Sequence, residues 1–249
     1  MRSSAAIITV LLSLCFCAAR DASAQSWADH ARISVNIGAQ PNTSTFTTTQ
    51  TVPVYQQTAT VTSSYGVPNG IFFDGGVTLK VSGGFGIDVG ASAFNRSQTA
   101  SISGQIPHPL IGGRLRPLSG TSPQMERNEI AGHVDAAYVL SLGRVDLVVA
   151  AGAAFFTVSQ DLAESVTFAE SPTFDTVTFT GVVVSKAMAT ALGVDAGIDV
   201  GVKLSKNVAV GAVVRFARAS MTFPLANTAS GAHADAGGTH VGAGLRFYF

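Results

Sequence analysis

Residues 238–249, the last of the sequence, read Gly-Thr-His-Val-Gly-Ala-Gly-Leu-Arg-Phe-Tyr-Phe. Successive side chains of a β-strand point to opposite faces, so this stretch has two distinct faces. One face is entirely apolar and consists of Val241, Ala243, Leu245, Phe247 and Phe249. The other is small or polar and consists of His240, Gly242, Gly244, Arg246 and Tyr248. An apolar face that ends in aromatic rings is typical of a strand that crosses a membrane, because such rings concentrate where hydrocarbon meets headgroups.

The same alternation recurs in seven further segments. These are residues 31–40, 71–81, 85–94, 129–140, 145–155, 188–203 and 208–216. In each, Val, Ile, Leu, Phe or Ala occupy one parity, while Gly and the charged residues occupy the other. A soluble barrel would place its apolar parity inside, but here the polar parity carries the ionic groups, which favours an apolar face toward lipid.

Long and short connections between these segments alternate along the chain. The short ones predict tight turns, and the four long ones predict excursions beyond the membrane. We expect residues 43–51 and 55–64 to form an extended hairpin with Pro53 in its turn, and residues 159–185 to turn near Pro172. We expect residues 95–127 and 221–237 to be loops. Short turns on one side, long connections on the other and an even number of strands are typical of outer-membrane barrels.

Residues 1–24 predict a cleavable signal peptide, which leaves residues 25–249 as the barrel domain. Arg2 precedes an apolar run, and Ala22-Ser23-Ala24 resembles a cleavage site. Both cysteines, Cys15 and Cys17, fall in this leader, so no disulfide or cysteine-ligated metal is expected in the remainder. Beyond the leader, the longest apolar run is too short for a membrane helix.

The composition supports a surface that faces lipid. Only 12% of the residues are charged and 47% are hydrophobic, whereas an average soluble domain is about 25% charged. The formal net charge is zero, and neither a phosphate loop nor a basic stretch is present, so we expect no nucleic-acid partner and no cofactor.

With its leader, its eight alternating segments and the terminal Leu245-x-Phe247-x-Phe249, the chain resembles the small outer-membrane barrels of the OmpA/OmpX/OmpW kind. The resemblance covers nearly all of residues 25–249. It implies an all-β fold, a transmembrane eight-stranded antiparallel up-and-down β-barrel of the bacterial outer membrane, in contact with membrane lipid and lipopolysaccharide. It also implies that Val241, Ala243, Leu245, Phe247 and Phe249 carry the signal that the barrel-assembly machinery reads during biogenesis. We expect a monomer.

The inward parity predicts a network of charges in the lumen. Its members are Arg32, Asp74, Lys80, Asp88, Glu129, His133, Asp135, Asp146, Asp195, Asp199, Lys203, Arg215 and Arg246. A turn centred on Ser205 places Asp195 opposite Arg215. Because eight strands leave little space beyond side chains, we favour a closed network. The many inward glycines leave a narrow pore open as the alternative, although they also suit tightly coiled strands.

Two further sets of residues are candidates for chemistry. His133 and Asp135 share one face but have no obvious serine partner, and His233, Asp235 and His240 could suggest a metal site, although a solvated loop is the simpler interpretation. Four arginines in or beside the second long connection could bind lipopolysaccharide phosphates, or could be merely solvated. They are Arg96, Arg114, Arg116 and Arg127.

From these observations we expect a non-catalytic outer-membrane barrel that serves envelope structure, surface interaction or adhesion. The first alternative is a narrow pore for small solutes. The second is a barrel enzyme that modifies lipid A.

Overall fold

The computed structural model describes residues 30–41, 43–225 and 231–249, and the predicted signal peptide at residues 1–24 lies outside them. Within this part of the chain, no helix has the length and apolarity needed to cross a membrane. The strands are β1 Ala31–Gln40, β2 Ser44–Val54, β3 Gln57–Val67, β4 Gly70–Ser82, β5 Phe85–Gln98, β6 Ala100–Pro107, β7 Leu115–Thr121, β8 Met125–Leu142, β9 Val145–Glu170, β10 Val177–Lys203, β11 Val208–Phe223 and β12 Ala232–Tyr248.

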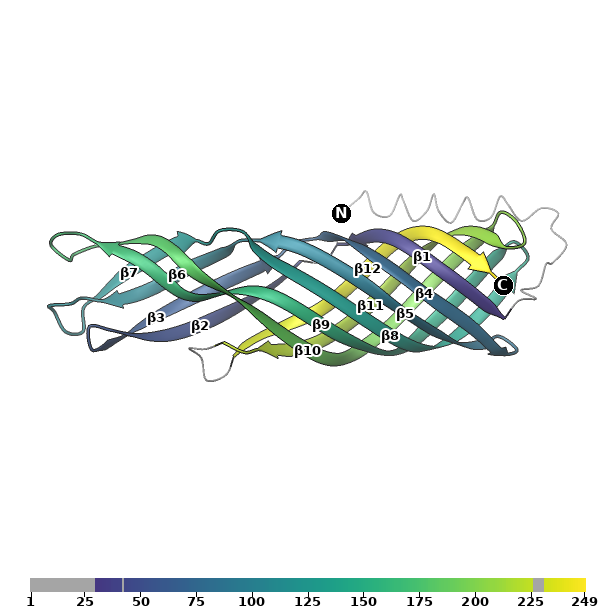
Figure 1. Ribbon diagram of the computed structural model, residues 1–249, viewed down its shortest axis with the longest axis horizontal. Helices are drawn as coiled ribbons and strands as arrows, with labels where there is room; N and C mark the ends of the chain where they lie inside the picture. The colour runs from purple at the N-terminus through teal and green to yellow at the C-terminus, as the bar shows by residue number, and fades with distance from the viewer. Residues whose placement is uncertain (1–29, 42, 226–230) are drawn as a thin grey trace.

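Eight of these strands close into a barrel in the order β1-β12-β11-β10-β9-β8-β5-β4. Every neighbouring pair is antiparallel, and the ring closes where β1 meets β12, with Val35 opposite Leu245. The start of β1, the end of β12 and the turns β4–β5, β8–β9 and β10–β11 lie at one end of the molecule (Figure 1). The prediction of an eight-stranded antiparallel barrel is confirmed.

The outer surface of the barrel is an apolar belt. Val35, Ile71, Val134, Leu192 and Val214 are each at least half exposed, although all are hydrophobic. At about 3.3 Å per residue and a tilt of about 40°, residues 130–140 of β8 rise roughly 25 Å, the height of the lipid-facing band in such barrels. Exposed aromatic rings mark both edges of this belt. Phe73, Phe155 and Phe216 lie at one edge, and Phe85, Tyr138 and Phe249 lie at the other.

The apolar residues of the closing strand belong to this belt. Val241, Leu245 and Phe249 are exposed, and Phe247 is half-exposed. Ala243 is exposed on the same outer face. Their recognition by the assembly machinery remains a prediction.

Beyond the belt, the chain builds an extension that was mostly expected to be loop (Figure 1). The prediction for residues 95–127 was wrong, because they contain the end of β5, all of β6 and β7 and the start of β8. The loop predicted at residues 221–237 is wrong at both ends, because β11 continues to Phe223 and β12 begins at Ala232; residues 226–230 lie outside the described residues. The second sheet has the order β2-β3-β6-β7.

The hairpin turns agree with the expectations in part. The β9–β10 turn follows Glu170 and includes Pro172, as predicted. Pro53 instead pairs with Thr58 inside the β2–β3 ladder, and the turn falls at Tyr55 and Gln56, both of which have positive φ. Proline cannot donate to a ladder, and β2 is an edge strand of its sheet, which explains why Pro53 is tolerated there.

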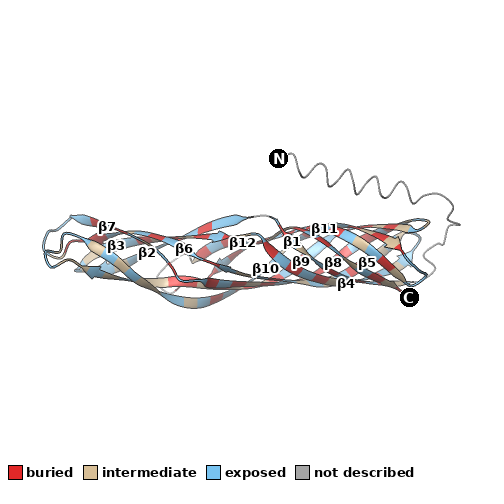
Figure 2. Ribbon diagram, turned by 90° about the horizontal axis from the view of Figure 1, so that it is seen from above, coloured by how far each residue is buried: buried red, intermediate tan, exposed pale blue. Residues whose placement is uncertain are grey.

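Buried and exposed residues alternate along the strands of both the belt and the extension (Figure 2), but the polarity of the two faces inverts between the two parts. Along β9, the inward positions change from Asp146 near the short turns to the fully buried Val158 and Leu162 farther along. The outward positions change from Phe155 to Ser159, which is half-buried. The extension therefore encloses an apolar core, which includes Phe46, Tyr65, Ile102, Leu118 and Phe223. Water surrounds this part, so the apolar side chains point inward.

The lipid belt gives the first prediction. Val89→Arg places a charge near the middle of the belt and should lower the free energy of unfolding by about 2–4 kcal/mol. Ser97→Arg lies on the same face of β5 beyond the belt, where Ser97 is exposed, and should change it by no more than about 0.5 kcal/mol. Denaturant unfolding in lipid vesicles measures both. Equal losses for the two variants would contradict the position of the belt.

Candidate functional site

The predicted lumen residues point into the barrel. Of these residues, Lys80 is half-buried and the others are buried. The buried members are Arg32, Asp74, Asp88, Glu129, His133, Asp135, Asp146, Asp195, Asp199, Lys203, Arg215 and Arg246. They come from all parts of the ring and lie in layers along the barrel axis.

The layer nearest the short turns is well neutralised. Asp199 accepts from Arg32 at 2.9 Å and from Arg246 at 2.8 Å, and Lys203 Nζ lies 3.0 Å from Asp146. The ring of Tyr248 lies 5.2 Å from the same ammonium. The sequence had suggested an ionic interior, but the interior at this level is only partly ionic. A small apolar cluster of Ala137, Val139, Val148, Ala150, Ala209 and Tyr248 is also buried inside.

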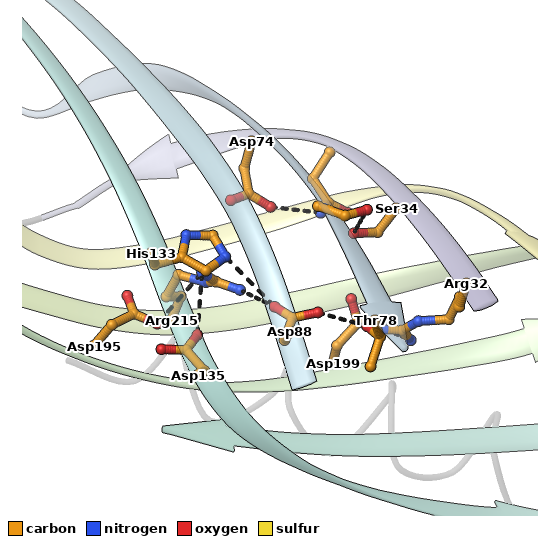
Figure 3. A network of polar contacts seen from close by, with 12 residues as sticks. Arg32, Ser34, Asp74, Thr78, Asp88, His133, Asp135, Asp195, Asp199 and Arg215 are labelled. Carbon is orange, nitrogen blue, oxygen red and sulfur yellow. Dashed lines mark hydrogen bonds and ion pairs between the residues drawn. The ribbon is translucent and has the colours of Figure 1, made fainter. Parts of the chain in front are cut away.

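The central layer is acidic and gathers around Arg215 (Figure 3). The guanidinium lies 3.3 Å from Asp88, 3.3 Å from Asp195 and 3.9 Å from Asp135. His133 Nε2 lies 3.4 Å from Asp88 Oδ2. Two neutral donors support this layer: Thr78 donates to Asp88 at 2.5 Å, and the Asn36 amide donates to Asp74 at 2.8 Å.

The predicted pairing of Asp195 with Arg215 is confirmed as a contact, but the predicted register is wrong. Arg215 lies opposite Gly197, and Asp195 lies opposite Ala217. The turn is therefore displaced from Ser205, and the ion pair is diagonal. Long side chains such as arginine span this diagonal distance between neighbouring strands.

The inward glycines make room for large neighbours and do not widen a channel. A Cβ at Gly90 would lie 2.6 Å from His133 Nε2, and a Cβ at Gly152 would lie 2.6 Å from Asp135 Oδ1. The cavity beside Arg32, Asp88 and Arg215 has a volume of about 10 Å³, which is room for roughly one water molecule. Side chains therefore close the lumen at this level.

Above the acidic layer, the interior becomes aromatic and then apolar. Arg127 pairs with Glu129 at 2.6 Å and donates to the Asp235 carbonyl at 2.8 Å. Phe72 stacks on His240 at 4.7 Å between ring centroids, and His240 Nε2 lies 2.9 Å from the Gln40 amide oxygen. The sequence analysis did not single out Phe72 or Gln40, although both lie on inward parity.

The metal set suggested by His233, Asp235 and His240 is wrong. His240 is buried inside the barrel, whereas His233 and Asp235 are exposed on its outer face. His233 Nδ1 lies 2.8 Å from Thr222 Oγ1, and Asp235 pairs with Arg218 at 2.6 Å. Successive side chains of a strand point to opposite faces. Residues 233 and 235 therefore face the opposite way from residue 240, and the three side chains do not converge.

The four arginines do not form an outward phosphate-binding patch, which corrects the expectation for Arg96, Arg114, Arg116 and Arg127. Arg116 and Arg127 are each 1% exposed, and Arg96 is half-buried. Arg116 pairs with Glu170 at 2.6 Å, and Arg127 is bound inside the barrel. The physical reason is that residues 95–127 form strands, whose inward positions bury these side chains. Arg114 alone of the four is exposed and pairs with Asp175 at 3.0 Å.

The far end of the extension joins three hairpin turns. Tyr55, in the β2–β3 turn, donates to Glu170 at 2.8 Å, and this hydrogen bond to a carboxylate raises the pKa of the phenol. Arg116 also donates to the Phe174 carbonyl at 2.9 Å, which ties β7 to the β9–β10 turn. Leu110 lies at the same end of the extension as these contacts, and it is 77% exposed. We call three exposed apolar residues at this end the distal tip: Leu110 and Ile111 of the β6–β7 connection, and Leu115 at the start of β7.

No family model matches the sequence, and no curated protein is similar to it. Among solved structures, the chain is similar to the outer membrane protein OprG from Pseudomonas aeruginosa, with 11% identity, a TM-score of 0.51 and coverage of 89% of this chain and 96% of that chain. The outer membrane protease OmpT from Escherichia coli aligns with 11% identity, a TM-score of 0.49 and coverage of 93% and 100%. At such identities the likeness concerns the fold. The chain has the eight-stranded transmembrane fold of outer-membrane barrel proteins.

The acidic layer gives the second prediction. Arg215→Met leaves Asp74, Asp88, Asp135 and Asp195 without their shared guanidinium and should lower the free energy of unfolding by about 3–5 kcal/mol. Arg218→Met is the matched control on the same strand, because Arg218 forms an exposed pair with Asp235 worth at most about 1 kcal/mol. Denaturant unfolding of the refolded barrels gives both values. A small loss for Arg215→Met would show that the layer does not depend on it.

Proposed function

We propose that this protein is a non-catalytic barrel of the bacterial outer membrane that holds a rigid extension away from the membrane for surface interaction or adhesion. Lipid and lipopolysaccharide surround its belt, and the barrel-assembly machinery acts on it during biogenesis. The observation that carries the proposal is the combination of a closed lumen with an ordered extension that ends in an exposed apolar tip.

The closed lumen disfavours the alternative function of a narrow pore for small solutes. Solute passage needs a continuous polar path, but the interior contains ion-paired side chains, a cavity of about 10 Å³ and a small apolar cluster. Farther along, the inward side chains become the apolar core of the extension. An ion in that core would lose its hydration without gaining ligands.

The architecture of the extension supports a role in presentation. Its core contains the buried Tyr65 and Ile102. The backbone N–H of Ala163 donates to the Tyr65 hydroxyl oxygen at 2.8 Å, which links the second sheet to β9. The three turns at the far end are joined by charged and polar contacts. A tip fixed in this way loses little conformational freedom on binding, which favours affinity.

A barrel enzyme has less support. A hydrolytic site needs a nucleophile, a base and an oxyanion site within reach of one another. His133 and Asp135 lie in the closed lumen, where a lipid or peptide substrate has no access. His233 and Thr222 are exposed and in contact, but Asp235 is held by Arg218 and does not orient the imidazole.

The closed lumen gives the third prediction. The protein reconstituted in planar bilayers should show no steady single-channel conductance above the lipid background. Heat-modifiable migration on gels confirms that the reconstituted barrel is folded. Reproducible channels from such folded protein would instead support the pore.

The tip gives the fourth prediction. Leu110→Ser combined with Ile111→Ser should reduce attachment of expressing bacteria to cultured epithelial cells by at least about tenfold, which corresponds to roughly 1.4 kcal/mol of binding. The change removes exposed apolar side chains and leaves the contacts of Tyr55 and Arg116 intact. Val183→Ser, on the exposed side of β10 away from the turn, is the matched control. Attachment that is equal for the parent and the double variant, at equal surface levels, would contradict the role of the tip.

A further inference from the structure

Three potential metal ligands converge in the acidic layer (Figure 3). His133 and Asp135 lie two residues apart on the inward face of β8, and Asp88 of β5 lies directly opposite Asp135 in the ladder. The ligand atoms of the three residues all lie within 4.8 Å of one another. All three side chains are buried.

The carboxylate of Asp135 gives a second indication of a metal site, independent of the clustering of ligands, because it is buried without a close partner. It is 2% exposed, yet neither of its carboxylate oxygens accepts a hydrogen bond from the protein. Its nearest cation is Arg215 Nη1 at 3.9 Å, at the outer limit of an ion pair. A buried carboxylate directly opposite a second carboxylate is destabilising unless positive charge lies between them.

The excess of negative charge in the layer also favours a bound cation. Asp74, Asp88, Asp135 and Asp195 all act electrostatically on Arg215, which is the one guanidinium that they share among the described residues. Its contacts of 3.3–3.9 Å are longer than the 2.6–3.0 Å contacts of the other buried ion pairs. The arginine is thus spread over several carboxylates and neutralises none of them closely. A divalent cation would reduce the uncompensated charge from three to one.

We propose that Asp88, His133 and Asp135 bind a divalent transition metal of the zinc class inside the barrel. Two carboxylates and one imidazole are a ligand set that suits zinc and its neighbours better than magnesium or calcium. Tetrahedral coordination places ligand atoms about 3.4 Å apart, and His133 Nε2 already lies 3.4 Å from Asp88 Oδ2. The Asp135 oxygen lies within 4.8 Å of both other ligand atoms, and coordination requires a side-chain rotation that brings it to the same distance.

The surroundings of the three ligands fit this role. Thr78 donates to Asp88 Oδ1 and fixes the carboxylate as an outer-shell partner does. Asp88 Oδ2 faces His133 Nε2 at 3.4 Å and also accepts a long contact of 3.3 Å from Arg215, which the metal would replace. Gly90 and Gly152 supply the space for the imidazole and for Asp135, because a Cβ at either position would lie 2.6 Å from these groups. The metal would brace β5 to β8 in the interior.

The closed lumen determines how the metal enters. An ion reaches this layer while the barrel folds and then exchanges slowly, because side chains close the path on both sides. The inference is independent of the proposed surface role, which depends on the extension.

The experiment is to refold the full chain in detergent with ZnCl₂ or with EDTA and to remove free metal by gel filtration. Bound zinc is then measured by elemental analysis, and thermal stability is measured by circular dichroism. The parent protein should retain about one zinc per chain and unfold about 5–10 °C higher than the EDTA-refolded protein. His133→Gln and Asp135→Asn should retain less than about a tenth as much. His240→Gln, which changes the other buried lumen histidine, is the matched control and should retain as much zinc as the parent.

Asp135→Asn keeps the test decisive if other variants fold poorly. It removes a buried uncompensated charge, so the EDTA-refolded variant should be at least as stable as the EDTA-refolded parent, but zinc should no longer raise its melting temperature. Zinc retention that is absent in the parent, or equal in Asp135→Asn, overturns the proposal. A parent that is stabilised by lower pH and not by zinc also overturns it, because protons would then neutralise the layer.

Discussion

The hydrogen-bonding demand of the backbone in a hydrocarbon solvent underlies the whole structure. Each N–H and C=O group inside a bilayer must find a protein partner, and a sheet meets this demand only when it closes on itself. The contact of β1 with β12 closes the ring and leaves no edge strand in the belt. Once the ring is closed, each strand has one face toward lipid and one toward the lumen. The ionic residues then occupy the lumen, because charges on the lipid face are costly.

The same strands pass from one solvent to another, and their side chains change accordingly. Along β11, outward Val214 and Phe216 give way to Arg218 and Ser220, while inward Arg215 gives way to the buried Met221 and Phe223. The pairing of β11 with β12 continues through this transition without a register shift. The membrane boundary is therefore encoded in the chemistry of each face and not in the strand boundaries.

The two opposite patterns together explain why the barrel is closed and its extension is ordered. In the belt, paired charges fill the interior; in the extension, apolar side chains fill it. A narrow eight-stranded ring leaves little further space. The two roles proposed for this protein are thus assigned to two places. They are the acidic layer inside, where groups are fixed but inaccessible to large substrates, and the turns at the far end, where groups are exposed.

The sequence by itself determined the eight strands and the sign of their two faces, because alternation is a local property that the chain displays over ten residues. It also determined which charges point inward. It did not determine the extension, whose strands are rich in Thr and Ser and bury only scattered apolar residues such as Val61 and Ile102. Their inward direction depends on a second sheet that forms only by long-range pairing. The contact of Arg116 with Glu170, the hydrogen bond from Arg127 to the Asp235 carbonyl, and the position of Asp88 opposite Asp135 were likewise decided by the tertiary structure. Strand register and tilt set which inward residues become neighbours, and both are properties of the closed ring as a whole.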